Sequence, residues 1–255
     1  MIKKELNIFF TAVLFYTRIP VPKSIIFSSI ALNKATRYFP FIGILVGTVG
    51  AIVYWICYHF FSIHISVLFS ILSMILLTGA FHEDAVADFC DGFGGGYNKV
   101  RILAIMKDSH IGTYGTIALI LLLLFKFLLL SECNPLQIPS IIIAAHAFSR
   151  LNSVLMIFTS RYVRNDESSK AKAVGGEKIL LSLFIALLFG CTPLVFLPYR
   201  VLYFIVPFSV CIFLYFRYYV HKKIGGYTGD VLGALQQFSE IGFYSMYIVA
   251  TKLLL

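Results

Sequence analysis

The chain has 255 residues, of which 59% are hydrophobic and only 13% are charged. A soluble domain is about 45–50% apolar and about 25% charged, so this composition argues against a soluble protein and indicates an integral membrane protein. The net charge of +9 could suggest nucleic-acid binding. The Lys and Arg residues instead fill short gaps between apolar runs, which is typical of membrane orientation and of attraction to anionic lipid, so we expect no nucleic-acid partner.

The chain begins with an apolar stretch, residues 5–20, that is short and ends beside Pro20 and Pro22. We expect an interfacial or re-entrant helix there. Beyond it, apolar runs of about 20 residues, the length that crosses a hydrocarbon core as a helix, predict about seven spans. These spans are 39–60, 64–81, 111–130, 138–159, 179–198, 201–220 and 230–251. The expected fold is therefore all-α, a polytopic transmembrane helical bundle in which residues 1–255 form a single domain.

Between the predicted spans, gaps that contain Lys or Arg alternate with gaps that do not. Gaps 82–110, 160–178 and 217–229 contain Lys or Arg, whereas gaps 61–63 and 131–137 contain none. Positive charge accumulates in cytoplasmic loops, so we expect the N-terminus and the three basic loops on the cytoplasmic face and the C-terminus outside. The protein is thus predicted to be a multi-pass protein of the cell (inner or cytoplasmic) membrane.

An acidic segment directly follows the second predicted span. If the helix continues, Asp84, Asp88 and Asp91 lie at i, i+4 and i+7, within roughly 60° of one another around the axis, while His82 and Glu83 point elsewhere. Three carboxylates in one stripe repel each other, and near a membrane they protonate or demand a cation. Because Mg²⁺ prefers carboxylate oxygens and substrate phosphates, the stripe predicts a magnesium site. A solvated acidic cap on a helix end is the alternative.

A glycine-rich segment and a short polar run come next. We expect Gly92 to end the helix, so that Gly94 and Gly95 lie in a loop whose backbone can approach phosphate, although a plain flexible loop fits equally well. Lys107 either binds phosphate or is only one of the positive charges that cytoplasmic loops carry. Asp108 either belongs to the site or caps the third span.

The last predicted span opens with a polar block. Asp230, Gly233 and Gln237 share one helical face, and Glu240 lies deeper, where a carboxylate is a functional candidate. The alternative is an N-cap followed by small-residue helix packing.

The fourth predicted span carries His146 and Arg150 at i and i+4. They either hold a substrate phosphate or pair with an acid such as Glu240. A purely structural ion pair is the alternative for Arg150. Lys126 stands alone in a Leu-rich run, and we assign it no role.

These residues fall into blocks that resemble the cobalamin synthase family, the adenosylcobinamide-GDP ribazoletransferases. The matching blocks, in the family order, are residues 17–22, 37–43, 82–92, 106–112, 149–150 and 225–234. The chain departs from the family pattern at Ala85-Val86, where Gly-Leu is usual. Alanine still permits a helix, so the departure removes no ligand.

The resemblance implies an activity and a set of site residues. The family joins adenosylcobinamide-GDP to α-ribazole, or to its 5′-phosphate, and releases GMP in the last step of nucleotide-loop assembly. Together with the carboxylate stripe and the basic loops, this reaction leads us to expect Mg²⁺ as cofactor and an active site on the cytoplasmic face. Our hypothesis for the catalytic residues places Asp84, Asp88 and Asp91 on the metal, with Asp108 and Asp230 as further ligands or as the base. The implied substrate-binding residues are Lys107, Arg150, Gly94, Gly95, Thr228 and Gln237.

Two other classes of protein remain open from the residues alone. One is a different magnesium-dependent intramembrane transferase, similar to prenyltransferases or to CDP-alcohol phosphotransferases. The other is a cation or metabolite transporter, although the acids gather at one end of the spans rather than at the midplane. The expected partners are the corrinoid nucleotide, α-ribazole and membrane lipid, with a second copy of the chain or other corrinoid-pathway enzymes as further candidates.

Overall fold

A computed structural model describes residues 2–164 and 178–254, and these residues form helices joined by short connections. The helices are α1 (Ile2–Tyr16), α2 (Ser29–Ala35), η1 (Thr36–Tyr38), α3 (Phe39–Tyr58), α4 (Ile63–Thr78), α5 (Phe81–Gly95), α6 (Lys99–Ile105), α7 (Thr113–Ser131), α8 (Ile138–Thr159), α10 (Leu180–Cys191), η2 (Thr192–Phe196), α11 (Tyr199–Ile224) and α12 (Gly229–Leu254). The described ranges hold no strand beyond one isolated bridge between Tyr162 and Tyr227. The predicted all-α class is confirmed.

Several of these helices are long and apolar enough to cross a membrane. Within the described residues, four candidates pass by length and composition alone: Ser29–Tyr58, α7, α8 and α11. A fifth is added if α4 and α5 together form one broken span. The protein is therefore a helical membrane bundle, as predicted, whereas the count of seven spans is not confirmed.

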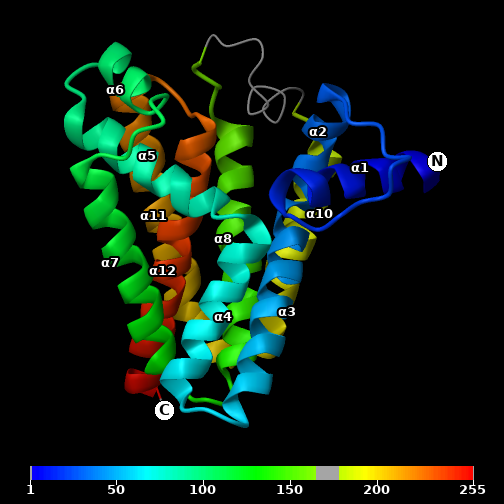
Figure 1. The fold of residues 1–255 in the computed structure, drawn as a ribbon, viewed down its shortest axis with the longest axis vertical. Coiled ribbons are helices and arrows are strands. Elements are labelled where there is room, and N and C mark those ends of the chain that lie inside the picture. Colours follow the sequence, from blue (N-terminus) through cyan, green and yellow to red (C-terminus); the bar gives the residue numbers. More distant parts are fainter. Residues whose placement is uncertain (1, 165–177, 255) are drawn as a thin grey trace.

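The centre of the bundle is α8, which is buried along most of its length (Figure 1). Its neighbour α3 approaches it closely because two glycines face it. A Cβ at Gly43 would overlap the carbonyl oxygen of His146, and one at Gly47 would come within 2.8 Å of the Cα of Ile143. Small residues allow such backbone contact between membrane helices, where van der Waals packing replaces the hydrophobic drive of water.

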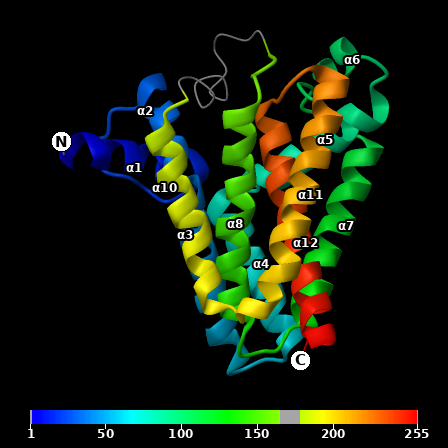
Figure 2. The ribbon, with the colours of Figure 1, turned by 180° about the vertical axis from the view of Figure 1, so that it is seen from behind.

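One end of the bundle collects the basic connections (Figures 1 and 2). The connection after α8 and the one after α11 pair there, since the N–H of Tyr227 donates to Arg161 O at 3.0 Å and the N–H of Val163 donates to Tyr227 O at 3.1 Å. α5 and α6 cover the same end, and α1 lies across the bundle axis near it, as an interfacial helix would. The three predicted basic loops thus share one end, although most of loop 160–178 lies outside the described residues.

The acidic segment does not continue the second span, and this expectation was wrong. α4 ends in a Schellman motif at Gly79, where φ is 69°, and Ala80 has φ of 58°, so the chain turns by 86° before α5 begins. Arg18 fixes this turn: its N–H donates to Leu77 O, and its guanidinium occupies the space that a Cβ at Gly79 would need. α5 consequently lies across the end of the bundle.

The predicted helix end at Gly92 was also wrong, since α5 continues to Gly95. The N–H of Gly96 still donates to Gly92 O at 2.9 Å. Packing outweighs the low helix propensity here, because the missing side chain of Gly92 leaves space that Met106 fills. Gly94 and Gly95 therefore belong to the last turn of a helix and not to a loop.

Candidate functional site

The site begins where α5 crosses α12. Two residues on one face of α12, Gly233 and Gln237, contact α5. Gly233 lies against Ala85, and a Cβ on the glycine would overlap that of the alanine. One turn further along α12, Gln237 Nε2 donates to Glu83 Oε1 at 3.1 Å. The face predicted for α12 is therefore the face that receives the acidic helix.

The carboxylates of α5 and α12 gather beside this crossing. Asp84 is exposed, Asp88 is half-buried and Asp91 is buried. Burial, and then the negative charges of Asp230, Asp84 and Asp91, raise the pKa of Asp88 from 3.8 to about 7. Poor solvation and nearby negative charges each raise the pKa of a carboxyl group. The structure thus brings four of the five predicted catalytic acids together.

Asp91 has a second task that the sequence did not reveal. Its Oδ2 accepts from the N–H of Gly112 at 2.6 Å, and its Oδ1 accepts from the N–H of Gly115 at 2.8 Å. Both glycines are required, because a Cβ at either would overlap the carboxylate. Asp91 therefore satisfies the free amides at the start of α7 and fixes α5 to that helix.

Asp230 is paired with a cation that the sequence analysis passed over. Arg164 Nη2 lies 2.7 Å from Asp230 Oδ2 and also donates to Met106 O at 3.0 Å. The cap of α12 is Thr228, whose Oγ1 accepts from the N–H of Val231 at 3.3 Å. Thr228 is fully buried in this role. No sequence signal distinguished Arg164 from the other Arg and Lys residues of the predicted basic loop 160–178.

The remaining surface candidates lie around α6. Asp108 is exposed between α6 and α7, apart from the other acids, and the N–H and Nδ1 of His110 contact its Oδ1 at 3.1 and 2.7 Å. These contacts hold the pKa of Asp108 below its usual value. Lys107 is exposed at the same turn. Gly94 and Gly95 are exposed on α5, and Gly94 packs against the ring of Tyr114.

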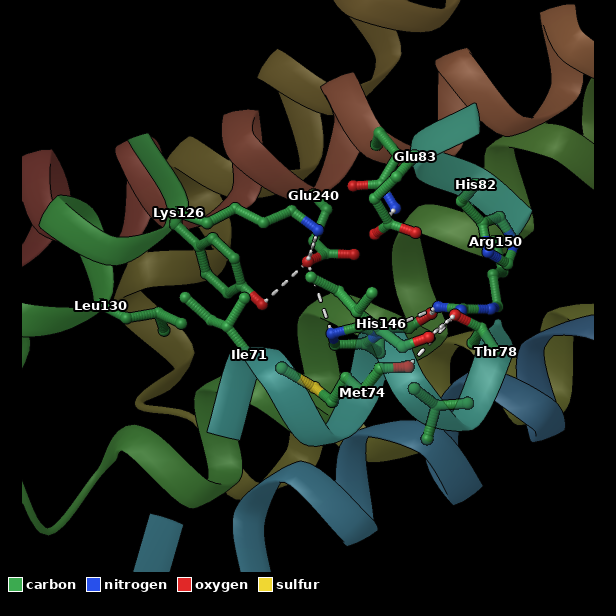
Figure 3. A pocket seen from close by; sticks show the side chains of 14 residues that line it. Ile71, Met74, Thr78, His82, Glu83, Lys126, Leu130, His146, Arg150 and Glu240 are labelled. Carbon is green, nitrogen blue, oxygen red and sulfur yellow. Dashed lines mark hydrogen bonds and ion pairs between the residues drawn. The ribbon is translucent and has the colours of Figure 1, made fainter. Parts of the chain in front are cut away.

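A second polar group lies inside the bundle, centred on Glu240 (Figure 3). Lys126 Nζ is 2.8 Å from Glu240 Oε1, and His146 Nε2 is 3.4 Å from the same oxygen. Gln236 Nε2 donates to Glu240 Oε2 at 2.7 Å, and Tyr244 OH donates to Oε1 at 3.2 Å. Glu240 does meet His146, one of the two alternatives, but its closest cation is Lys126, to which no role was assigned. A lysine within a predicted span was itself the signal.

Arg150 is 1% exposed and belongs to this interior group. Its Nη1 lies 3.1 Å from His146 Nδ1 and donates to His146 O at 2.8 Å. Its guanidinium carbon also lies 5.5 Å from the ring centre of Phe39. The structure thus places Arg150 among helices α3, α5, α8 and α12 rather than on the exposed end with Lys107.

The cavity inside this group has a volume of about 10 Å³, room for about one water molecule. Five side-chain atoms of its lining are buried without a hydrogen-bond partner: His82 Nε2, Glu83 Oε2, His146 Nε2, Arg150 Nε and Gln237 Oε1. Lys126 and Arg150 balance the charges of Glu83 and Glu240, so this space needs no ion for neutrality. A bridging water would satisfy several of these atoms.

The donor set at the α5–α12 crossing fits a hard cation only in part. Within the described ranges, no three His, Cys, Asp or Glu side chains are arranged to hold a metal ion by themselves. Mg²⁺, however, is usually held by one or two carboxylates and completed by substrate phosphates and water. Asp84 and Asp88 supply two such carboxylates, and their mutual repulsion favours a cation between them.

Fold and site together define a class: a multi-pass helical membrane protein with an acidic site at one end. Comparison with protein families matches residues 8–248 to cobalamin-5-phosphate synthase. Relatives described as adenosylcobinamide-GDP ribazoletransferase, from Shewanella sp. (strain W3-18-1) and Shewanella oneidensis, are each 43% identical over 98% of this chain and 97% of their own. The chain belongs to the cobalamin-5-phosphate synthase family. No solved structure matches it.

Proposed function

We propose that the protein is an adenosylcobinamide-GDP ribazoletransferase. It joins adenosylcobinamide-GDP to α-ribazole, or to the 5′-phosphate of α-ribazole, and releases GMP in the last step of nucleotide-loop assembly. The observation that carries the proposal is 43% identity to relatives of that name over nearly the whole of both chains. The gathering of acids from α5 and α12 at one end of the bundle supports it independently.

The reaction is a phosphoryl-group transfer. A ribose hydroxyl of α-ribazole forms a new P–O bond to the phosphorus that carries cobinamide, and the P–O bond to GMP breaks. Positioning and charge neutralisation dominate catalysis of such transfers. Bound Mg²⁺ would offset the diphosphate charge and stabilise the leaving oxygen.

We assign a separate part of this reaction to each residue at the α5–α12 crossing. We assign the cation to Asp84 and Asp88, while Asp91, whose two oxygens accept from the amides of Gly112 and Gly115, holds α7 in place. Asp230, paired with Arg164, is the acceptor that we propose for the hydroxyl proton. Lys107 and Arg164 offset diphosphate charge at the open end. Gln237 and Thr228 act inside the protein, by holding α5 and by capping α12.

We place this site on the cytoplasmic face of the cell membrane. Helix α6 carries Lys99 and Arg101 at this end, and the connections beside it carry Lys107, Arg161 and Arg164. Positive charge marks the cytoplasmic side of a membrane protein. Alkaline phosphatase fused after the C-terminus, at the opposite end, is therefore expected to be active, since it folds only outside the cytoplasm. An inactive fusion would reverse the orientation.

The test is turnover by the detergent-solubilised protein, measured as GMP release from adenosylcobinamide-GDP and α-ribazole. Release is expected with Mg²⁺ and is expected to stop with a chelator. Asp84→Asn should lower kcat about 100-fold or more, the usual loss when a charge-stabilising group is removed. The control, Glu132→Gln, changes an exposed acid at the other end of α7 and should retain full activity. Near-normal turnover of Asp84→Asn that inserts normally would refute the assignment.

A further inference from the structure

A pocket of about 40 Å³ lies at the same end of the bundle, beside the α5–α12 crossing. Its walls are aromatic rings, two glycines and the aliphatic side chains of Ile157 and Leu232. Phe15 and Tyr16 come from α1, Phe39 from α3 and Phe81 from α5, and α12 contributes Gly229 and Gly233. We call these residues, together with His82, the aromatic pocket. Helix α1 thus contributes two side chains to a pocket beside the site.

The rings of the aromatic pocket are stacked. Tyr16 and Phe39 lie 4.3 Å apart between ring centres at an interplanar angle of 25°, and Phe39 and His82 lie 5.8 Å apart at 10°. Phe81 meets Tyr16 edge-on, at 79°. Because Tyr16, Phe39 and His82 stack directly on one another, they form one continuous ring surface, on which a planar aromatic guest gains from stacking and from edge-to-face contact.

One polar atom of this apolar lining has nothing to bond. His82 is 1% exposed, and its Nε2 is the only buried side-chain nitrogen or oxygen without a partner among the described lining residues. A buried imidazole nitrogen in this state costs free energy, and such exceptions call for a ligand or a water. His82 also lines the interior cavity around Glu240, and Tyr16 adds a hydroxyl to the aromatic pocket, so the pocket is a largely apolar space with few hydrogen-bonding groups.

The aromatic pocket adjoins the acids along both helices. His82 precedes Asp84 by two residues on α5, and Gly229 directly precedes Asp230 on α12. A nucleoside whose base enters the pocket would keep its ribose beside the carboxylates. That is the arrangement a ribose nucleophile needs.

We propose that the aromatic pocket binds the benzimidazole base of α-ribazole, with His82 Nε2–H donating to the imine nitrogen of the base. This assignment rests on the proposed function. Benzimidazole is planar, apolar and, once joined to ribose, has one hydrogen-bond acceptor. Guanine needs several donors and acceptors along its edges, which this lining lacks, and a corrin ring is far larger than the pocket.

The first test is equilibrium binding of α-ribazole, followed by benzimidazole fluorescence, to the full-length detergent-solubilised protein without the second substrate. Phe81→Leu removes a wall whose side chain is 42% exposed, so the fold should tolerate it. We expect about 3–10-fold weaker binding, the worth of one aromatic contact. The matched control is Tyr215→Leu, a 68% exposed residue in another aromatic groove, formed by Phe89, Phe216 and Tyr219. It should bind as the wild type does.

The second test compares two ligands, α-ribazole and an analogue that lacks the acceptor nitrogen. An indole riboside keeps the shape of the base but lacks the acceptor nitrogen, and it should bind the wild type about tenfold more weakly, the worth of one hydrogen bond to a buried group. In His82→Leu the two ligands should bind alike. Discrimination that survives in His82→Leu would overturn the role of His82.

Turnover measured in parallel separates the pocket from the reaction. Suppose that turnover is normal but that α-ribazole binding does not change in Phe81→Leu, or that it weakens in Tyr215→Leu. Either result would overturn the assignment of the aromatic pocket to the base and would leave the transferase assignment intact. Binding that weakens in Phe81→Leu alone supports the pocket even if GMP release fails. Failure of GMP release in the wild type with both substrates and Mg²⁺ would instead overturn the proposed function.

Discussion

The ammonium group of Lys126 and the carboxylate of Glu240 lie 2.8 Å apart, with side chains that are 6% and 0% exposed. The pair joins α7 to α12 inside the bundle (Figure 3). Charges at such a depth persist only when they are paired, so each partner depends on the other. The ion pair ties the helix that Asp91 caps to the helix that carries Asp230.

Removal of one partner should therefore cost more than removal of both. Lys126→Met leaves Glu240 with an uncompensated charge, and we expect about 3–5 kcal/mol of destabilisation. The double variant Lys126→Met/Glu240→Gln should recover much of that loss. Thermal unfolding in detergent measures the cycle. Lys252→Met, which breaks an exposed 3.8 Å pair with Glu132, is the control and should change nothing measurable. Additive losses in the double variant would contradict the pairing.

The glycines that contact Asp91 give a second prediction. Gly115→Ala places a methyl group where the Asp91 carboxylate lies. It should therefore break the hydrogen bonds that the backbone amides at the start of α7 donate to Asp91, and destabilise the protein by about 1–3 kcal/mol. Gly95→Ala is the matched control on α5, where the new methyl would lie 3.5 Å from Ile105 in ordinary contact. It should be neutral or slightly stabilising. Thermal unfolding distinguishes the two, and equal effects would refute the close approach.

Arg164 should matter for turnover. Arg164→Gln loses the ion pair with Asp230, and we expect kcat to fall about tenfold or more while the protein remains folded, since hydrogen bonds to charged groups are worth about 1.5–3 kcal/mol. Arg164→Lys should recover part of the loss. Arg217→Gln, which changes an arginine bonded to Thr159 O at the same end, serves as the control. GMP release is the measurement, and identical activity of Arg164→Gln and Arg217→Gln would contradict a role for the pair.

Exchanging the side chains of Glu83 and Gln237 with each other should preserve the contact between α5 and α12. Their hydrogen bond of 3.1 Å joins α5 to α12, so Glu83→Leu should let α5 shift and lower turnover. In the reciprocal variant Glu83→Gln/Gln237→Glu, donor and acceptor change places and the helix contact survives. Turnover should then exceed that of either single change. A double variant no better than the singles would show that the charge of Glu83 matters rather than the contact.

The sequence anticipated the long elements well because their signals are local. The span predicted at 138–159 coincides with α8, and the acids at 84, 88 and 91 do share one helix. Gly79 was the available sign that the second span ends early. The contacts of Arg18 with Leu77 O and with the space beside Gly79, by contrast, come from another segment of the chain, and no local pattern encodes them.

Contacts between helices were the part that sequence reasoning could not supply. Pairing of Lys126 with Glu240, or of Arg164 with Asp230, depends on how each helix is rotated about its axis. Glu83 and His82 point away from the exposed Asp84, as expected, but the sequence did not show that this direction is the interior of the bundle. Predicting these contacts would have required the crossing of α5 over α12, which glycine and alanine at 233 and 85 determine by close approach.

The right-angled turn after α4 changes the direction in which the acids are spread. From Asp84 to Asp91 the helix rises about 10 Å, at 1.5 Å per residue. Had α5 continued α4, those carboxylates would stand at different depths in the lipid. Lying crosswise, they form a row at a single level, so a long amphiphilic diphosphate can settle along the rim of the bundle with its phosphates in line with the row and its bulky corrin left outside the helices.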